Sequence, residues 1–329
     1  MTTAMQETWH TADDHLVHAI EWHGAPTRAP RSAAPPVPPV VLVHGLGGST
    51  VNWQLVGEGL ALRLGTRVVA FDLAGFGRTA LGSRRATLGA NGHLLASLVR
   101  PLGPSVVVGN SMGGAISVGL AARHPELLRA LVLVDPALPR PLRPPGVRET
   151  FDGFTNLGGL AAAAIPVAGP QLVRYRMKQL GPAGTVDASL RIVCAHPSRV
   201  DAALRRDMVE LTAYRTAGND SARAYHDAIL SLVSYTSRRM AADIRTIRAP
   251  TLVIHGEHDR LVPLSLAKAV RRRRRDWTLE VFDDCGHVPM IEQPERFVAT
   301  MAKWLEARQP PVDHGVATGT YGAAGGTSR

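Results

Sequence analysis

The most informative segment of the sequence is Val106-Val-Val-Gly-Asn-Ser-Met-Gly-Gly114. Its first half is a β-branched run typical of a buried strand, and its second half opens a pattern typical of a helix. The motif Gly109-x-Ser111-x-Gly113 stands between them. A chain that passes from strand to helix in so few residues has strained backbone angles at the serine, and glycine on either side avoids a collision.

Such a turn exposes the hydroxyl of Ser111 at the carboxyl end of a sheet, where open α/β folds place their sites. It also puts Ser111 next to the N-terminus of a helix, whose free N–H groups favour developing negative charge. We therefore interpret Ser111 as a nucleophile. The alternative is that the small residues only let a helix pack closely on a strand.

A nucleophilic serine needs a base, and the base needs an acid that orients it. Asp259 follows a strand predicted at Thr251–His255, and His287 follows one predicted at Thr278–Phe282. The order serine, acid, histidine is the order found on this kind of sheet. Asp135 ends an earlier predicted strand and is a rival for the acid, although it could instead be the carboxylate of a turn or a helix cap.

A second loop can complete the site. Val40-Val-Leu-Val-His-Gly-Leu-Gly-Gly48 ends a predicted strand in a loop with three glycines. Because this loop has little side-chain bulk, we expect the backbone amides of Leu46 and Met112 to bind the oxyanion of a tetrahedral intermediate. A phosphate-binding loop is disfavoured, because no Gly-Lys-Ser/Thr follows and Thr50 stands where a dinucleotide loop requires its third glycine.

Short apolar runs alternate with helical stretches along most of the chain, which predicts βαβ units and a mainly parallel sheet. The runs are continuous rather than alternating, which indicates strands buried on both faces. The expected strands are Glu7–His10, His15–Trp22, Val40–His44, Arg67–Asp72, Ser105–Gly109, Ala130–Asp135, Thr251–His255 and Thr278–Phe282, of which the first two form a hairpin. The expected helices are Trp53–Leu64, Gly89–Leu98, Met112–His124, Leu264–Arg275 and Pro294–Arg308.

Between residues 136 and 247 no strand pattern occurs. Helices are expected there over Leu157–Leu180, Ser198–Thr216 and Ser221–Met240. A helical block that interrupts a βαβ series predicts a cap over one edge of the sheet. We therefore expect a core of residues 1–135 and 248–308, a helical cap of residues 136–247, and a disordered tail of residues 309–329, which has almost nothing to bury.

The chain has 329 residues, of which 37 are Lys or Arg and 27 are Asp or Glu, so its formal net charge is +10. Nucleic acid is the obvious partner to test for such a charge. The run Arg271–Arg275 closes a predicted helix, where cations complement the carbonyl end of the dipole. No aromatic residues or RNA-module signature accompany it, so we expect no nucleic-acid partner.

Other classes are disfavoured by what the chain lacks. No apolar run reaches the roughly 18 residues of a membrane span, and no secretory signal is visible, so we expect a cytoplasmic protein. Cys194 and Cys285 cannot build a disulfide framework. His255 and His258 have no third ligand nearby in the sequence, so neither a metal nor a cofactor is expected.

Together these residues resemble the α/β-hydrolase family, in particular its cap-bearing serine hydrolases. The matching stretches follow the family's order from Val40 to Arg308: His44-Gly-Leu-Gly-Gly, Asp72-Leu-Ala-Gly-Phe-Gly-Arg78, Gly109-Asn-Ser-Met-Gly-Gly, Gly256-Glu-His-Asp259 and Gly286-His287. The resemblance implies an α/β-hydrolase fold, with a mostly parallel eight-stranded sheet, helices on both faces and an inserted helical cap. It also implies that Ser111, Asp259 and His287 are nucleophile, acid and base.

The expected activity is hydrolysis of an ester or related acyl bond in a small apolar substrate, through an acyl-enzyme. Aspartate usually stands at this turn in epoxide hydrolases and dehalogenases, so Ser111 argues against both. Cleavage of a C–C bond in a diketone-like substrate stays open, because C–C hydrolases often share Gly-Asn-Ser-Met-Gly-Gly. A non-hydrolytic biosynthetic helper or binding protein on the same fold also stays open. Trp53 and Asn110 are candidates for lining the substrate pocket, although Trp53 could equally pack in the core.

Overall fold

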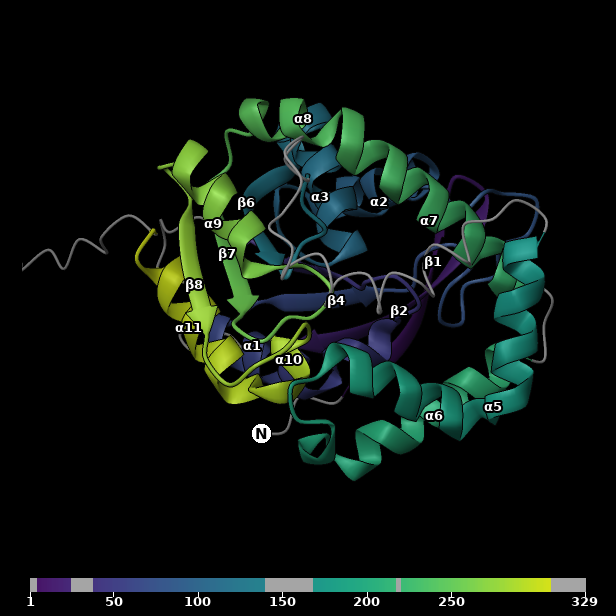
Figure 1. The fold of residues 1–329 in the computed structure, drawn as a ribbon. Coiled ribbons are helices and arrows are strands. Elements are labelled where there is room, and N and C mark those ends of the chain that lie inside the picture. Colours follow the sequence, from purple (N-terminus) through teal and green to yellow (C-terminus); the bar gives the residue numbers. More distant parts are fainter. Residues whose placement is uncertain (1–4, 25–37, 140–167, 217–219, 309–329) are drawn as a thin grey trace, which may run out of the picture.

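One sheet of eight strands runs through the part of the chain that the structure, a computed structural model, describes: residues 5–24, 38–139, 168–216 and 220–308 (Figure 1). The strand order is β1-β2-β4-β3-β5-β6-β7-β8. β1 pairs antiparallel with β2 and β2 with β4, while all later pairs are parallel, which confirms the predicted sheet. The strands are β1 Gln6–Ala12, β2 His15–His23, β3 Val40–Val43, β4 Arg67–Phe71, β5 Ser105–Asn110, β6 Leu128–Val134, β7 Thr251–Gly256 and β8 Thr278–Phe282.

The hairpin of β1 and β2 is closed by a turn of two residues. Ala12 pairs with His15, and Asp13 and Asp14 between them have φ angles of 49° and 59°. Positive φ at both central residues is the geometry of a type I′ turn, whose twist matches that of the flanking strands. Aspartate tolerates this conformation better than most residues, so the local sequence fixes the register of the hairpin.

Both faces of the parallel strands are covered by helices. Along β3, Val41 and Val43 belong to one apolar cluster, and Val40 and Leu42 belong to the other. The first cluster lies under α2 Leu88–Val99, α3 Met112–Arg123, α8 Met240–Thr246 and α9 Leu264–Arg273. The second lies under α1 Gln54–Leu64, α10 Pro289–Glu292 and α11 Pro294–Glu306. Short 3₁₀ turns occur at Thr50–Trp53, Arg100–Leu102, Pro125–Leu127 and Pro197–Arg199.

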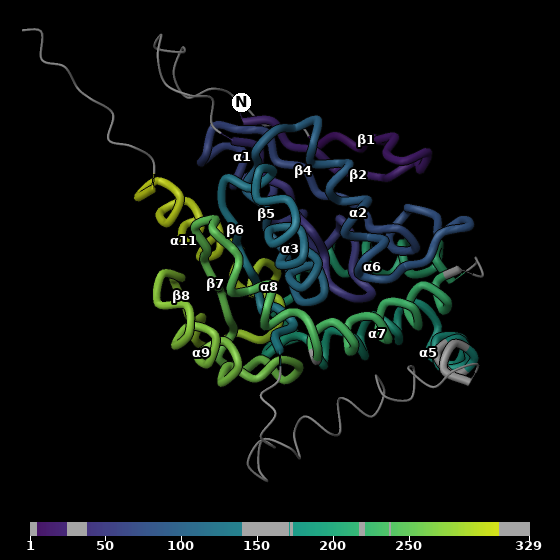
Figure 2. The backbone as a smooth tube through the Cα atoms, turned by 90° about the horizontal axis from the view of Figure 1, so that it is seen from above, coloured from purple at the N-terminus to yellow at the C-terminus, as the bar shows by residue number. Residues whose placement is uncertain are grey.

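Between β6 and β7 in the sequence, the described residues form three helices in addition to α8: α5 Ala168–Val193, α6 Ala202–Thr216 and α7 Asp220–Arg238. α7 runs from α8, beside α3, towards α5, and α6 packs against α5 (Figures 1 and 2). Asp201 begins α6, because its Oδ1 accepts hydrogen bonds from the N–H groups of Ala203 (2.8 Å) and Leu204 (2.9 Å). None of the helices described is both long and apolar enough to cross a bilayer.

The helix predicted at Leu157–Leu180 differs from the structure. Its first part, residues 157–167, lies outside the described residues, as does the predicted tail of residues 309–329. Its second part belongs to α5, which continues past Leu180 to Val193. Gly181 leaves helical geometry, with φ 65° and ψ 175°, and the helix resumes at Pro182. Proline is favoured at the first helical position, so the Gly-Pro pair ends one helical segment and starts the next.

The arginine run at the end of α9 takes part in local packing. α9 ends at Arg273, two residues before the predicted end. Arg274 lies with its guanidinium carbon 4.7 Å from the ring centroid of Trp277. It also pairs with Asp276 (2.6 Å) and donates to the carbonyl oxygen of Ile247 (2.8 Å). These contacts close the helix against the turn that leads into β8.

The glycines beside Ser111 provide a test of the strand-to-helix turn. A Cβ at position 109 would lie 2.5 Å from the carbonyl oxygen of Gly113 and 2.6 Å from Ser117 Oγ. Gly109→Ala is therefore expected to lower the free energy of unfolding by about 1–3 kcal/mol in urea titrations. The control is Gly89→Ala in the first turn of α2, where a Cβ meets nothing within 4 Å. That change is expected to raise stability by up to about 1 kcal/mol, and equal stabilities for the two variants would contradict the account.

Candidate active site

Ser111 lies between β5 and α3 in a backbone conformation that is rare for a residue with a side chain. Its φ is 53° and its ψ is −114°. The conformation is held from both sides, because the Ser111 N–H donates to the carbonyl oxygen of Val134 (2.9 Å) and its carbonyl oxygen accepts from Ala115 (3.1 Å). A Cβ at Gly113 would lie 2.4 Å from the carbonyl oxygen of Val43, so only glycine lets α3 approach β3 this closely. Strain over-determined by neighbouring contacts is typical of functional sites.

His287 and Asp259 are joined by a short hydrogen bond. His287 Nδ1 lies 2.7 Å from Asp259 Oδ2, and both side chains are buried. The other carboxylate oxygen, Oδ1, accepts from the N–H groups of Leu261 (2.8 Å) and Val262 (3.0 Å). Burial acts to raise the pKa of Asp259, but His287 and these hydrogen bonds outweigh it, so the pKa of Asp259 is lowered. An ionised Asp259 fixes the Nδ1 proton of His287 and leaves Nε2 able to accept a proton.

Asn110 connects the histidine loop to the serine turn. Its Nδ2 donates to the carbonyl oxygen of His287 (3.2 Å) and to that of Val134 (3.1 Å). The residue before Ser111 therefore holds the backbone of His287 beside β6. Asn110 was a candidate for lining the pocket, but its buried amide is directed at these carbonyl groups instead.

Trp53, the other pocket candidate, packs in the core. Its side chain is fully buried within the second apolar cluster, and its ring centroid lies 6.4 Å from that of Phe297 in α11. No part of the Trp53 side chain is therefore exposed in this structure. Of the two alternatives for Trp53, lining the pocket or packing in the core, the structure favours packing in the core.

The glycine loop after β3 is positioned by a neutral, fully bonded histidine. His44 Nδ1 donates to the carbonyl oxygen of Gly45 (2.7 Å), and Nε2 accepts from the N–H of Leu73 (3.1 Å). Burial lowers the pKa of His44, which favours the neutral imidazole that this pairing needs. Within the described residues, neither the Leu46 amide nor the Met112 amide has a hydrogen-bond acceptor. Both amides are thus free to bind an external oxygen.

Asp72 holds together the segments that lie next to this glycine loop. It is fully buried, and its Oδ1 accepts from the N–H of Thr50 (2.7 Å). Its Oδ2 accepts from the N–H of Arg78 (2.8 Å) and lies 2.7 Å from His18 Nδ1. A Cβ at Gly77 would lie 2.0 Å from this carboxylate, so the glycine lets the chain wrap around it. The motif that begins at Asp72 is therefore structural.

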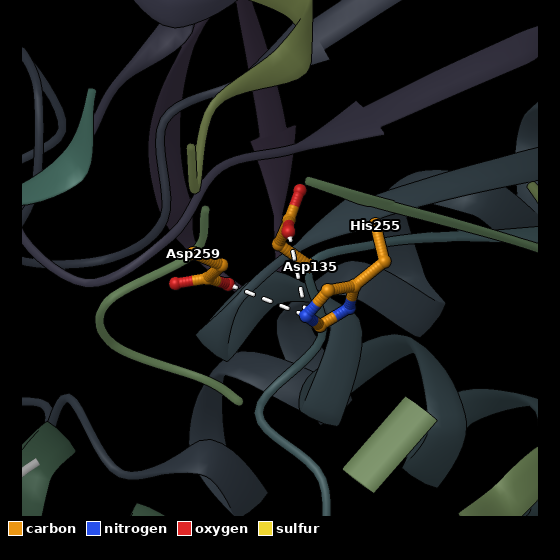
Figure 3. A group of neighbouring side chains, drawn as sticks. All are labelled: Asp135, His255 and Asp259. Carbon is orange, nitrogen blue, oxygen red and sulfur yellow. Dashed lines mark ion pairs between the residues drawn. The ribbon is translucent and has the colours of Figure 1, made fainter. Parts of the chain in front are cut away.

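Asp135 and His255 lie against Asp259, in an arrangement that no local sequence pattern predicts (Figure 3). His255 Nε2 lies 3.6 Å from Asp259 Oδ2 and 3.7 Å from Asp135 Oδ1. Asp135 Oδ1 also accepts from the N–H of Gly256 (2.9 Å). Asp135 is therefore neither a turn nor a helix-cap carboxylate, as one alternative had it. Nor does it take the place of the acid, because it is Asp259 that bonds to His287.

One atom each from Asp135, His255 and Asp259 could face a common cation, since these atoms lie within 4.8 Å of one another. The hydrogen bonds fit such a site poorly. His255 Nε2 lies 2.9 Å from the carbonyl oxygen of Val262, a group that can only accept. This nitrogen therefore carries a proton and has no lone pair for a metal. Burial lowers the pKa of His255, which keeps the ring neutral between the two acids.

Glu292, which the sequence did not single out, ties the histidine loop to α5. Its Oε1 accepts from the N–H of Gly286 (2.8 Å), and its Oε2 accepts from Ala195 (2.7 Å). The N–H of His287 donates to the carbonyl oxygen of Val193 at the end of α5 (2.7 Å). The loop that carries the histidine is thus anchored to the helical insertion as well as to the sheet.

Known proteins resemble this chain in sequence and in fold. The 2-hydroxy-6-oxo-2,4-heptadienoate hydrolase of Pseudomonas putida is 31% identical over 276 residues, which cover 82% of this chain and 89% of that protein. The pimeloyl-(acyl-carrier protein) methyl ester esterase of Aromatoleum aromaticum is 32% identical over 266 residues, which cover 78% of this chain and 94% of that protein. The crystal structure of a bacterial membrane phospholipase A matches with a TM-score of 0.68 at 26% identity, over 92% of this chain and 86% of that one.

The family assignment rests on the length of the match as well as on these relatives. The sequence model of the Alpha/beta hydrolase family matches residues 40–300, which include β3 to β8, the serine turn and the histidine loop. The resemblance inferred from the motifs is thereby confirmed, and the chain belongs to the alpha/beta hydrolase family.

Proposed function

We propose that this chain is a serine hydrolase that cleaves an ester or related acyl bond through an acyl-enzyme. Ser111 is the nucleophile, His287 the base and Asp259 the acid that orients it. The observation that carries the proposal is the buried bond from His287 Nδ1 to Asp259, with Asn110 holding the same histidine beside the strained serine turn. Helices α5, α6 and α7 act as a cap over this edge of the sheet.

The geometry supports a two-step reaction. His287 Nε2 takes the proton of Ser111 as its oxygen attacks the carbonyl carbon, and then protonates the leaving group. The amides of Leu46 and Met112 bind the oxyanion, and loss of one such donor costs on the order of 100- to 1,000-fold in turnover. A water molecule activated by His287 then hydrolyses the acyl-enzyme. Asp259 stays ionised throughout and stabilises the transient imidazolium.

Asp135 and Asp259 are neighbouring buried carboxyls, and their protonation states determine the charge beside His287. Burial and the adjacent Asp259 raise the pKa of Asp135 well above its ordinary value. Two facing buried carboxyls avoid repulsion when only one is ionised. Asp135 Oδ2 has no hydrogen-bond partner among the described residues, so no N–H donor stabilises a negative charge on this oxygen. We therefore assign the negative charge to Asp259 and the proton to Asp135.

Cleavage of a C–C bond is the second candidate. It is favoured by the relative from Pseudomonas putida, whose name describes a 2-hydroxy-6-oxo-dienoate, a conjugated keto acid. The same nucleophile, base and oxyanion amides would serve both reactions. The relative from Aromatoleum aromaticum, named as a methyl ester esterase, favours the ester reaction at similar identity.

A fluorophosphonate probe tests the nucleophile. We expect the folded protein to be labelled at Ser111, as located by peptide mass spectrometry, because this serine has both a base and an oxyanion site. Ser111→Ala should abolish labelling. Ser117→Ala is the matched control on the same helix, since its Oγ only bonds to the Gly113 carbonyl oxygen, and it should label normally. Absence of labelling in the folded wild-type chain would instead support a non-hydrolytic helper or binding protein.

A substrate panel separates the two hydrolytic reactions. The wild-type chain is expected to hydrolyse p-nitrophenyl esters, with at least a 1,000-fold loss of kcat in Ser111→Ala, on the order seen when a triad member is removed. A vinylogous diketone serves as the C–C substrate. Turnover of the diketone with no activity on any short ester would replace the ester proposal by the C–C one.

The protonated Asp135 has a consequence for stability. Its folded pKa is raised, so its carboxyl is neutral in both states at low pH but ionises only in the unfolded state at higher pH, which lowers stability. Asp135→Asn removes this loss while keeping an acceptor for Gly256. The variant is expected to match the wild type near pH 4 and to exceed it by at least about 1 kcal/mol at pH 8. Asp207→Asn on the exposed side of α6 is the control, and a pH-independent loss in Asp135→Asn would contradict the assignment.

A further inference from the structure

Arg215, near the end of α6, reaches the loop that carries the oxyanion amide. Its Nη1 donates to the carbonyl oxygen of Gly47 (3.1 Å), the residue after Leu46. Its guanidinium carbon lies 5.5 Å from the ring centroid of the buried Phe76. The side chain is half-buried, so the helical insertion places a cation at the edge of the proposed site.

No carboxylate among the described residues lies within ion-pair distance of this guanidinium. Asp72 is a nearby acid, but its two oxygens are already occupied by backbone N–H groups and by His18. Other arginines around the insertion are paired. Arg205 lies 2.7 Å from Asp187, and Arg85 lies 2.7 Å from Asp227.

The partial burial of Arg215 without an ion-pair partner disfavours its charged form. Burial lowers its pKa, and Asp72 and Tyr225 offset only part of that effect. A guanidinium partly removed from water is stabilised when it gains an anion, and it binds carboxylates through two parallel N–H bonds. Its hydrogen bond to the Gly47 carbonyl oxygen is the one it makes within the described residues, which leaves most of its five N–H donors for such a partner.

Tyr225 of α7 converges on the same glycine. Its ring carbon lies 3.1 Å, and its hydroxyl oxygen 3.8 Å, from the position that a Cβ of Gly47 would occupy. Burial raises the pKa of Tyr225, so the phenol stays protonated and can donate a hydrogen bond. A second donor, from a different helix, therefore stands at Gly47, whose carbonyl oxygen accepts from Arg215.

We propose that Arg215 and Tyr225 form an anion subsite that binds a carboxylate carried by the acyl part of the substrate. This inference rests on the proposed serine hydrolase function and names its substrate class: esters whose acyl chain ends in a carboxylate. The carbonyl group under attack lies at the Leu46 amide, and the carboxylate lies one residue further along the loop, so a short chain joins the two. Arg215 and Tyr225 determine specificity and take no part in the chemical step.

Two esters with the same leaving group and the same acyl chain length test whether the subsite favours a terminal carboxylate. Mono-4-nitrophenyl adipate carries a terminal carboxylate, and 4-nitrophenyl hexanoate carries a methyl group at that position. The ratio of their kcat/KM values is expected to favour the adipate. Arg215→Met should lower the ratio about 10- to 100-fold, as expected for loss of hydrogen bonds to a charged group. Arg215→Lys keeps the charge but not the fork, so it should give an intermediate ratio, and Tyr225→Phe a smaller loss.

Arg206→Met provides the matched control, because Arg206 is an exposed arginine of the same helix. It should leave the ratio unchanged. A purely structural role of Arg215, tying α6 to the loop, would lower activity on both esters equally in Arg215→Met and leave the ratio intact. That result, or a wild-type ratio near one, overturns the subsite.

A binding measurement separates this inference from the hydrolase proposal. In the Ser111→Ala background, calorimetric titration with monomethyl adipate and with methyl hexanoate needs no turnover. Adipate binding should exceed hexanoate binding, and the difference should fall at least tenfold when Arg215→Met is added. Equal binding of the two ligands, or binding of neither, refutes the subsite. A retained binding preference in a wild-type chain that hydrolyses neither ester refutes only the proposed hydrolysis.

Discussion

The site depends on one buried hydrogen bond, from Nδ1 of His287 to the carboxylate of Asp259. An ionised group in the interior is costly unless its remaining lone pairs are satisfied. Here the backbone amides of Leu261 and Val262 satisfy one oxygen of Asp259, and the histidine satisfies the other. Burial and the adjacent Asp259 raise the pKa of the second carboxyl at this place, that of Asp135, which favours its neutral form beside the bond. The surrounding groups thus decide which acid is charged and which nitrogen of the histidine is free.

The sheet brings these groups together because the carboxyl ends of its parallel strands share one edge. β5 leads into Ser111, β7 into Asp259 and β8 into the loop of His287, while β3 leads into the glycine loop. Close approach at this edge requires residues without a Cβ. A side chain at Gly256 would lie 1.9 Å from the carbonyl oxygen of Gly286, so the acid and histidine loops could not sit together with any larger residue there. The glycines that mark the motifs therefore follow from packing as much as from chemistry.

Local patterns were sufficient to predict all eight strands and the loops that carry the proposed triad, since each depends on neighbours within a few residues. Contacts between segments that are distant in the sequence could not be predicted from local patterns. Glu292 accepts hydrogen bonds from Gly286 and Ala195, and Arg215 donates one to Gly47, yet neither Glu292 nor Arg215 stands in a recognisable motif. The environment of Asp135 belongs to the same class, because it is set by β7 rather than by the turn that follows. The Gly181-Pro182 pair can be recognised in the sequence as the end of a helix. The same pair can also start a new helix, so it did not show that α5 continues beyond it.

We propose that a serine, a histidine and two backbone amides converge on one reacting carbon. A crystal structure of the chain after reaction with a fluorophosphonate would show whether they do. We expect phosphorus bonded to Ser111 Oγ. The phosphoryl oxygen should lie within hydrogen-bond distance of the Leu46 and Met112 amides, with His287 Nε2 facing Oγ and Nδ1 still bonded to Asp259. Phosphorus on another side chain, or a phosphoryl oxygen directed away from both amides, would contradict it.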